Sequence, residues 1–100
     1  MALVIAQDYK YLGNDYWKWS AWIEGPAKEL DKVESVTYNL HPTFPNPVRR
    51  IDSRRNNFRL ESAGWGVFML YASVLRKDGS TERLKHYLEL PYPDSKLAEA

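Results

Sequence analysis

The chain has 100 residues, with 14 Lys and Arg against 13 Asp and Glu, so its formal net charge is +1. This length suits one domain, and the near-neutral charge argues against a protein whose whole surface binds nucleic acid. The lack of cysteine excludes disulfides and thiolate metal sites, no apolar run approaches the roughly 20 residues of a membrane span, and we expect a cytoplasmic protein, or a nuclear one if the source is eukaryotic.

Apolar and polar side chains alternate over much of the chain, which predicts β-strands rather than helices. Residues 3–12 are a candidate first strand, and Gly13-Asn14-Asp15 forms a turn signal after it. Residues 17–24 alternate clearly, with Trp19 as a candidate core residue. Gly25-Pro26 then breaks the pattern. The polar stretch 27–32 has room for one helical turn.

The middle of the chain combines a strand with a stiff, basic connection. Val36, Tyr38 and Leu40 alternate with polar neighbours and predict a strand, which three prolines between 42 and 47 bring to an end. The connection that follows carries Arg49, Arg50, Arg54, Arg55 and Arg59. We expect a solvated loop with acidic partners nearby, and a weak phosphate-contacting patch is the alternative. A short strand is expected around Phe58 and Leu60.

The last third reads as a turn and a hairpin. Gly64-Trp65-Gly66 indicates a flexible turn around one large ring. Nearly every residue from 67 to 75 is apolar, which predicts a central strand covered on both faces. Asp78-Gly79 is a strong hairpin signal, and residues 84–90 form the return strand. Residues 91–100 are expected to form a tail that is helical or frayed.

These elements predict an all-β protein in which six to eight short antiparallel strands build a sandwich or barrel. We expect residues 1–100 to form a single domain, which could be cut from a longer chain. His86 falls on the apolar face of the return strand and is expected to be a hydrogen-bonded core or edge histidine. The two histidines lack acidic partners at suitable spacing, so no metal or other cofactor is expected.

Three blocks, in this order, resemble the YEATS domain family. They are Trp19 to Pro26, with Trp at the start and Gly-Pro at the end; Val33 to Pro47, with Leu-His-Pro-Thr-Phe before a Pro-rich loop; and Phe58 to Phe68, with Glu-Ser-Ala-Gly-Trp-Gly-Val-Phe. The resemblance extends over residues 15 to 90, and the Trp17-x-Trp19-x-Ala21 rhythm is more similar to the prokaryotic branch of the family.

The resemblance implies an immunoglobulin-like β-sandwich with a ligand groove at one end. The groove is formed by the loop after Leu40 and the loop around Trp65. Eukaryotic members read acylated lysine on histone tails, so the resemblance implies a non-catalytic module that binds an acyl-lysine-like ligand or a peptide between aromatic residues. The ligand-binding residues it implies are His41, Thr43, Phe44, Trp65, Gly66 and Phe68.

Each of these residues has an expected role, and some have a plain structural alternative. Phe44 and Trp65 sandwich the flat acyl amide while the Thr43 hydroxyl hydrogen-bonds it. Gly66 keeps the backbone low enough for its N–H to reach the amide, and Phe68 serves as core and pocket floor. His41 either contacts the ligand or anchors the loop, and Phe44 either contacts the ligand or plugs the sandwich end.

One residue departs from the pattern of the family, and one alternative function stays open. Asp15 stands where the family usually has an aromatic residue, and an acid there favours a basic peptide. The alternative function is a protein-protein interaction or dimerisation domain of a bacterial signalling or immunity system, with a partner protein domain or a second copy as ligand. We expect a monomer or weak homodimer. An enzyme is disfavoured because no serine has a nucleophile-elbow context.

Overall fold

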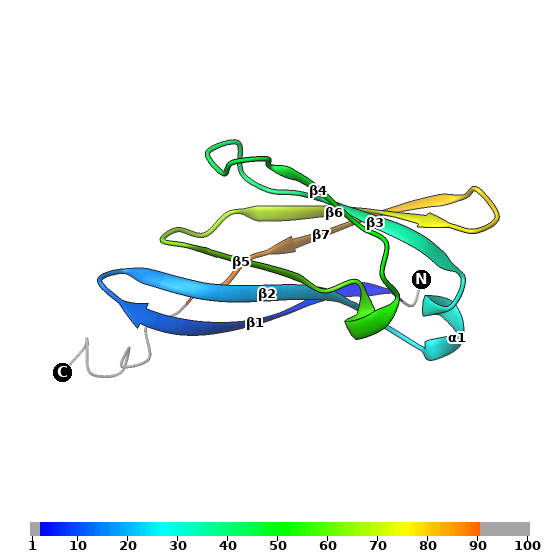
Figure 1. The fold of residues 1–100 in the computed structure, drawn as a ribbon, viewed down its shortest axis with the longest axis horizontal. Helices are drawn as coiled ribbons and strands as arrows, with labels where there is room; N and C mark the ends of the chain where they lie inside the picture. Colours follow the sequence, from blue (N-terminus) through cyan, green and yellow to red (C-terminus); the bar gives the residue numbers. More distant parts are fainter. Residues whose placement is uncertain (1–2, 91–100) are drawn as a thin grey trace.

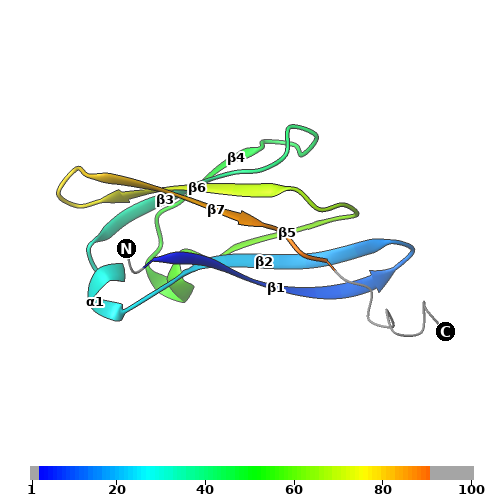
Figure 2. The ribbon, with the colours of Figure 1, turned by 180° about the vertical axis from the view of Figure 1, so that it is seen from behind.

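The structure is a computed structural model that describes residues 3–90. Within this range, two antiparallel sheets lie face to face (Figure 1), and Figure 2 shows the same two layers from behind. The three-stranded sheet has the order β1-β2-β5 and the four-stranded sheet the order β4-β3-β6-β7. The elements are β1 Val4–Gly13, β2 Tyr16–Glu24, α1 Ala27–Leu30, β3 Val33–Asn39, β4 Val48–Ile51, the 3-10 turn η1 Arg55–Asn57, β5 Leu60–Gly64, β6 Met69–Arg76 and β7 Thr81–Tyr87. The predicted all-β antiparallel sandwich is confirmed.

The core lies between the two sheets and follows the predicted alternation. Every second residue of β2 from Trp17 to Ile23 is buried, and Trp19 is only 1% exposed, as expected for a core residue. The largest side chains enclosed from all sides are Trp19, Tyr38, Phe58, Ile23, Leu70, Leu88, Val36 and Val74. Burying this much apolar surface is the main driving force for a sheet sandwich of this size.

The loops separate cleanly between the two ends of the sandwich. The loop 40–47 between β3 and β4, the β5–β6 connection and the β1–β2 turn lie at one end, and α1 and the β6–β7 turn lie at the other (Figure 1). The β1–β2 turn is tight because Asn14 and Asp15 both take positive φ angles, 54° and 57°. Asn and Asp tolerate this conformation, and it matches the twist of a two-residue hairpin.

The strand after the Gly-Trp-Gly segment differs from the prediction. We expected residues 67–75 to be covered on both faces, but β6 alternates, and its outward residues Met69 and Tyr71 are exposed. In this run only Ser73 marks the solvent side, so period two was largely hidden in the sequence. β6 is still a central strand, because it lies between β3 and β7.

The arginine-rich connection also differs from the prediction. Arg49 and Arg50 lie in the short strand β4, which pairs with β3, rather than in a loop. Phe58 is fully buried but has left-handed backbone angles, and the strand begins only at Leu60. Arg54 and Arg59 do have the acidic partners expected, at 3.0 Å and 3.1 Å.

The β6–β7 hairpin forms at Asp78-Gly79 as predicted, with Gly79 at a φ of 91°. Regular pairing of the return strand ends at Tyr87, although Leu88 and Leu90 remain buried. The tail predicted for residues 91–100 lies outside the described residues.

A glutamine ties the two sheets together beside β7. The Gln7 side chain on β1 donates from Nε2 to the carbonyl of Glu89 at 2.8 Å, and its Oε1 accepts from the Glu89 N–H at 2.7 Å. The same Oε1 lies 2.7 Å from His86 Nε2, so that ring nitrogen carries the proton and donates. His86 is therefore a partly buried, hydrogen-bonded edge histidine, as predicted.

A buried tyrosine fixes the irregular segment before β5. Tyr38 is fully buried, and its hydroxyl donates a hydrogen bond to the carbonyl of Phe58 at 2.7 Å. Phe58 itself has a φ of 58°, which is uncommon for a bulky residue. The hydrogen bond therefore holds an unfavourable backbone conformation in place and pairs a carbonyl that would otherwise be buried without a partner.

We expect Tyr38→Phe to lower the unfolding free energy by about 1–2 kcal/mol, because the Phe58 carbonyl loses its donor. Burial raises the pKa of Tyr38 above its usual value. The folded-state pKa thus exceeds the unfolded value of about 10, so this group's contribution is complete below pH 10 and declines as the pH rises further. Urea unfolding between pH 8 and 11 should show a flatter alkaline decline for Tyr38→Phe than for Tyr87→Phe, which alters an exposed tyrosine. Equal declines would contradict this assignment.

Candidate ligand-binding site

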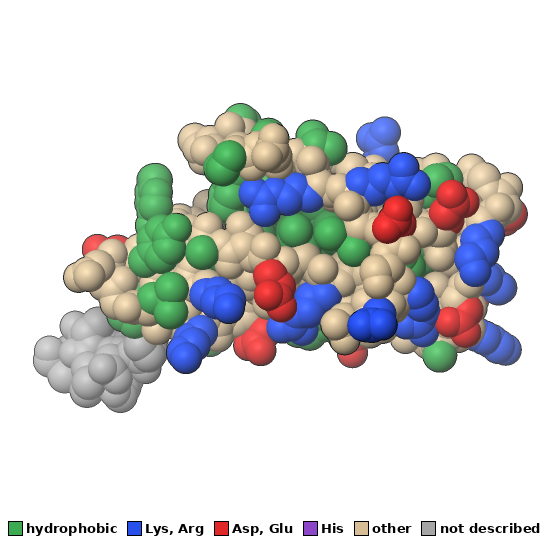
Figure 3. Space-filling model, in the orientation of Figure 1, with side chains coloured by type: hydrophobic (Ala, Val, Ile, Leu, Met, Phe, Trp, Pro, Cys, Tyr) green, Lys and Arg blue, Asp and Glu red, His purple; other side chains and the backbone are tan. Residues whose placement is uncertain are grey.

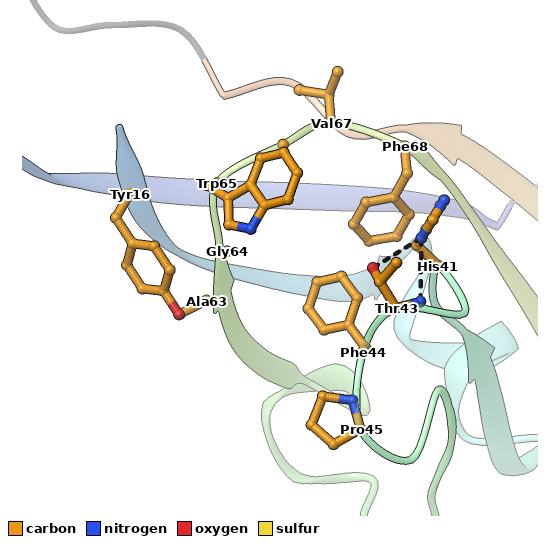
Figure 4. A pocket seen from close by; sticks show the side chains of 11 residues that line it. Tyr16, His41, Thr43, Phe44, Pro45, Ala63, Gly64, Trp65, Val67 and Phe68 are labelled. Carbon is orange, nitrogen blue, oxygen red and sulfur yellow. Dashed lines mark hydrogen bonds between the residues drawn. The ribbon is translucent and has the colours of Figure 1, made fainter. Parts of the chain in front are cut away.

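Two segments far apart in the sequence meet at one end of the sandwich and enclose an open pocket of about 290 Å³. All six residues implied by the resemblance line it, as Figure 4 shows for five of them by label. The full lining is Tyr16, His41, Thr43, Phe44, Pro45, Ala63, Gly64, Trp65, Gly66, Val67 and Phe68. Figure 3 shows exposed hydrophobic side chains gathered at this end of the molecule. The roles of the six implied residues toward a ligand remain predictions.

The loop after β3 is held by a set of local hydrogen bonds. The Leu40 N–H donates to the Pro47 carbonyl at 2.7 Å and closes the loop at its base. His41 Nδ1 accepts from the Thr43 N–H at 3.2 Å and lies 2.9 Å from the Thr43 hydroxyl (Figure 4). Because Nδ1 is an acceptor here, the hydroxyl donates to it and keeps its own lone pairs free to accept. His41 thus anchors the loop while also lining the pocket.

Arg49 stabilises the same loop from behind. Its Nε donates to the Asn46 carbonyl and its Nη2 to the Pro45 carbonyl, both at 3.0 Å. Its guanidinium carbon lies 6.0 Å from the centre of the Phe44 ring, at the outer limit of a cation–π contact. These contacts hold the proline-rich segment, and with it Phe44, in one conformation.

The floor of the pocket is an aromatic cluster continuous with the core. The ring centres of Phe44 and Phe68 are 5.3 Å apart, and Trp19 contacts both rings edge-on at 6.3 Å and 5.9 Å. Phe68 is only 8% exposed, so it serves both the core and the pocket floor, as expected. Phe44 is half-buried and packs against the core at the sandwich end, as one alternative predicted, and it also lines the pocket, where its contact with a ligand stays a prediction.

The opposite wall is formed by Trp65 and by a residue that the sequence analysis missed. Trp65 is 73% exposed, so its ring is available rather than packed. The β2–β5 register pairs Trp17 with Gly64, which brings Tyr16 alongside Trp65 at the pocket. The expected acid at this place is absent from the lining, because Asp15 lies in the β1–β2 turn. The signal in the sequence that could have identified Tyr16 is an aromatic residue directly after a hairpin turn.

The two glycines next to Trp65 differ in their constraints. Neither has a positive φ, so the flexible turn we expected here is ordinary extended or bent backbone. A Cβ at Gly64 would lie 3.4 Å from Phe44 Cζ, whereas a Cβ at Gly66 would meet nothing within 4 Å. Gly64 is therefore the position where the β5 backbone and the Phe44 ring pack directly together.

We expect Gly64→Val to move the Phe44 ring and to weaken any ligand that this ring contacts by roughly tenfold, because its branched side chain overlaps the ring. Gly66→Ala should leave the Phe44 ring in place. Comparing the two variants by the NMR shifts of the Phe44 ring protons checks this directly. A large ring displacement in Gly66→Ala, or none in Gly64→Val, would show that the contact has been misread.

The pocket contains no Asp, Glu, Lys or Arg among the described residues that line it. Its polar groups are the His41–Thr43 pair and backbone amides, which favour an uncharged, flat and polar-edged ligand. In residues 3–90, no group of three or more His, Cys, Asp or Glu side chains is placed to hold a metal ion. Across the same residues, we find no helix with the length and apolar character needed to cross a membrane.

The fold and the site together define an immunoglobulin-like sandwich that carries an aromatic-lined pocket at one end. The family model of the prokaryotic YEATS domain matches residues 17–89. The chain therefore belongs to the YEATS domain family, as the three sequence blocks predicted.

Known relatives and solved structures agree with this assignment. The chain is 39% identical over 66 residues to transcription initiation factor TFIID subunit 14 of Schizosaccharomyces pombe, covering 65% of this chain and 27% of that protein. It is 34% identical over 82 residues to the protein AF-9 homolog of Eremothecium gossypii, covering 76% and 38%. The chain thus spans well under half of these relatives.

Two solved structures of the Yaf9 YEATS domain have the same fold. The one bound to H3K27ac superposes with a TM-score of 0.75 at 24% identity, covering 93% of this chain and 74% of that one. The one described as recognizing an H3K122suc peptide gives a TM-score of 0.65 at 26% identity, covering 89% and 69%.

Proposed function

We propose that this chain is a non-catalytic recognition module that binds a peptide carrying an acylated lysine, with the acyl amide between Phe44 and Trp65. The observation that carries the proposal is the convergence of His41, Thr43, Phe44, Trp65 and Phe68 on one uncharged pocket. The Yaf9 YEATS structures with H3K27ac and with an H3K122suc peptide support it, because they belong to the same family.

The chemistry of the pocket suits an acyl amide better than a bare lysine. Acylation replaces the ammonium charge with a flat amide that two rings can stack against, and each good ring contact contributes about 0.5–1.5 kcal/mol beyond area burial. The Thr43 hydroxyl, already donating to His41, offers its lone pairs to the amide N–H. An ammonium would lose its water without gaining a carboxylate, which costs several kcal/mol.

The decisive experiment is an NMR titration of the ¹⁵N-labelled chain with three peptides that differ only at one lysine: acetylated, crotonylated and unmodified. We expect the amides of residues 41–44 and 64–68 and the Trp65 indole N–H to shift with the acylated peptides only. Amides of Lys77 and Asp78, at the opposite end of the sandwich, are the internal control. No shift with any peptide, or equal shifts with unmodified lysine, would overturn the proposal.

A further inference from the structure

The outer face of the four-stranded sheet is an exposed surface that shares no residue with the pocket lining. Strand alternation places Val48 and Arg50 of β4, Met69 and Tyr71 of β6, and Arg83, Lys85 and Tyr87 of β7 on this face. Tyr71 and Tyr87 are about half exposed, and Val48 is more exposed still. We call these seven residues the outer-face surface.

The strand register arranges this surface in rows across the sheet. One row runs from Arg50 through Thr37 and Ser73 to Arg83. The middle of that row consists of short, half-buried hydroxyl side chains, and an exposed arginine stands at each end, so we call it the Arg50–Arg83 row. The neighbouring row contains Tyr71 and ends at Lys85. Paired residues of adjacent strands share one face, so each row is a continuous strip.

The charged residues of the outer-face surface are all cations, and the ion pairs of the described residues do not include them. The ion pairs of the described residues use Lys32, Arg54, Arg59 and Arg76, and none involves a cation of the outer-face surface. Among outward positions of these four strands, the acid present in the described chain is Glu34, at the bulge where β3 begins. Arg50, Arg83 and Lys85 therefore lack a carboxylate of their own.

We propose that the outer-face surface docks an acidic, extended protein segment that crosses the strands along the Arg50–Arg83 row. Three strand spacings separate Arg50 from Arg83, about 14 Å, and an extended chain covers this distance in about four residues. The segment thus carries two carboxylates four residues apart, with an apolar residue between them that packs on Tyr71 in the neighbouring row. The partner segment is acidic because the charged residues of this surface are all cations, which favour a partner of opposite charge.

The composition of the surface favours a protein over a nucleic acid. Tyr, Met and Arg are the residues enriched in protein interfaces. Single-stranded nucleic acid requires rings stacked in succession along a basic groove, whereas here Tyr71 and Tyr87 lie diagonally on two adjacent strands and neither belongs to the Arg50–Arg83 row. The fixed spacing of the two guanidiniums also matches two separated carboxylates better than a continuous run of phosphates.

The test is a fluorescence anisotropy titration of the chain with the labelled peptide Gly-Glu-Ala-Phe-Ser-Glu-Gly and with its Gln-for-Glu counterpart. We expect saturable binding of the acidic peptide only. The variant Arg50→Gln/Arg83→Gln should weaken it by about five- to tenfold. The control variant Lys28→Gln/Arg55→Gln removes the same charge from exposed positions outside this face and should bind as the wild type does.

Three outcomes would overturn the proposal. They are the absence of saturable binding up to about 1 mM chain, equal losses in the two double variants, and tighter competition by a single-stranded oligonucleotide of equal charge than by the peptide. Trp65→Ala should leave acidic-peptide binding unchanged, so failure of this surface and failure of the acyl-lysine pocket are distinguishable.

Discussion

Trp65→Ala should lower the affinity for acylated peptide by roughly thirtyfold while leaving the unfolding free energy within about 0.5 kcal/mol of wild type. The Trp65 side chain is 73% exposed, so its removal costs little packing in the free protein. Under the proposed function the same ring covers one side of the acyl amide, so the variant would lose both the stacking contact and the buried apolar area. Isothermal titration calorimetry and urea unfolding measure the two quantities separately.

Three further variants decide whether the effect is specific. Tyr9→Ala removes an exposed ring of β1 outside the pocket lining and should alter neither quantity. Trp65→Phe should restore part of the affinity, because a smaller ring still stacks. Phe44→Ala should lower affinity and stability together, because Phe44 also packs against Trp19 and Phe68. If Trp65→Ala bound acylated peptide with wild-type affinity, Trp65 would not belong to the ligand-binding site.

The sequence predicts the parts of this fold in which polar and apolar residues alternate cleanly. β2 is the best example, because Trp17 and Trp19 face the core while Lys18 between them is exposed. The Asn14-Asp15 and Asp78-Gly79 turns were also readable, since each uses residues that tolerate positive φ. β4 was missed because two arginines and nearby prolines resemble a loop, and its pairing with β3 is a tertiary contact that local pattern does not encode.

Recognition of the site depended on two loops whose proximity is a property of the sandwich topology. Periodicity places Phe44 and Trp65 after separate strands, and only the family resemblance predicted that they meet. Tyr16 was missed because its place in the pocket depends on the register between β2 and β5, which pairs Trp17 with Gly64. The role of Arg49 in the loop was not predicted for a related reason, because its contacts with the Pro45 and Asn46 carbonyls depend on how the loop folds back.

Trp19 connects the stability of the sandwich to the shape of its pocket, so its replacement should have the largest effect on folding. Trp19→Ala should lower the unfolding free energy by about 3–5 kcal/mol, a large share of the 5–15 kcal/mol typical of a domain. The reason is that the indole is enclosed between the sheets and contacts both Phe44 and Phe68.

Trp19→Phe separates ring packing from the indole's polar atom. Trp19 Nε1 is buried and has no hydrogen-bond partner among the described residues, so the indole N–H is a cost that phenylalanine removes. The smaller ring leaves a cavity but keeps an edge-on contact with Phe68, so we expect a loss of only about 1–2 kcal/mol and acyl-peptide affinity close to wild type. Thermal and urea unfolding of both variants measure the difference. If Trp19→Phe were as destabilising as Trp19→Ala, the aromatic contacts under the pocket would not be what holds this end of the sandwich together.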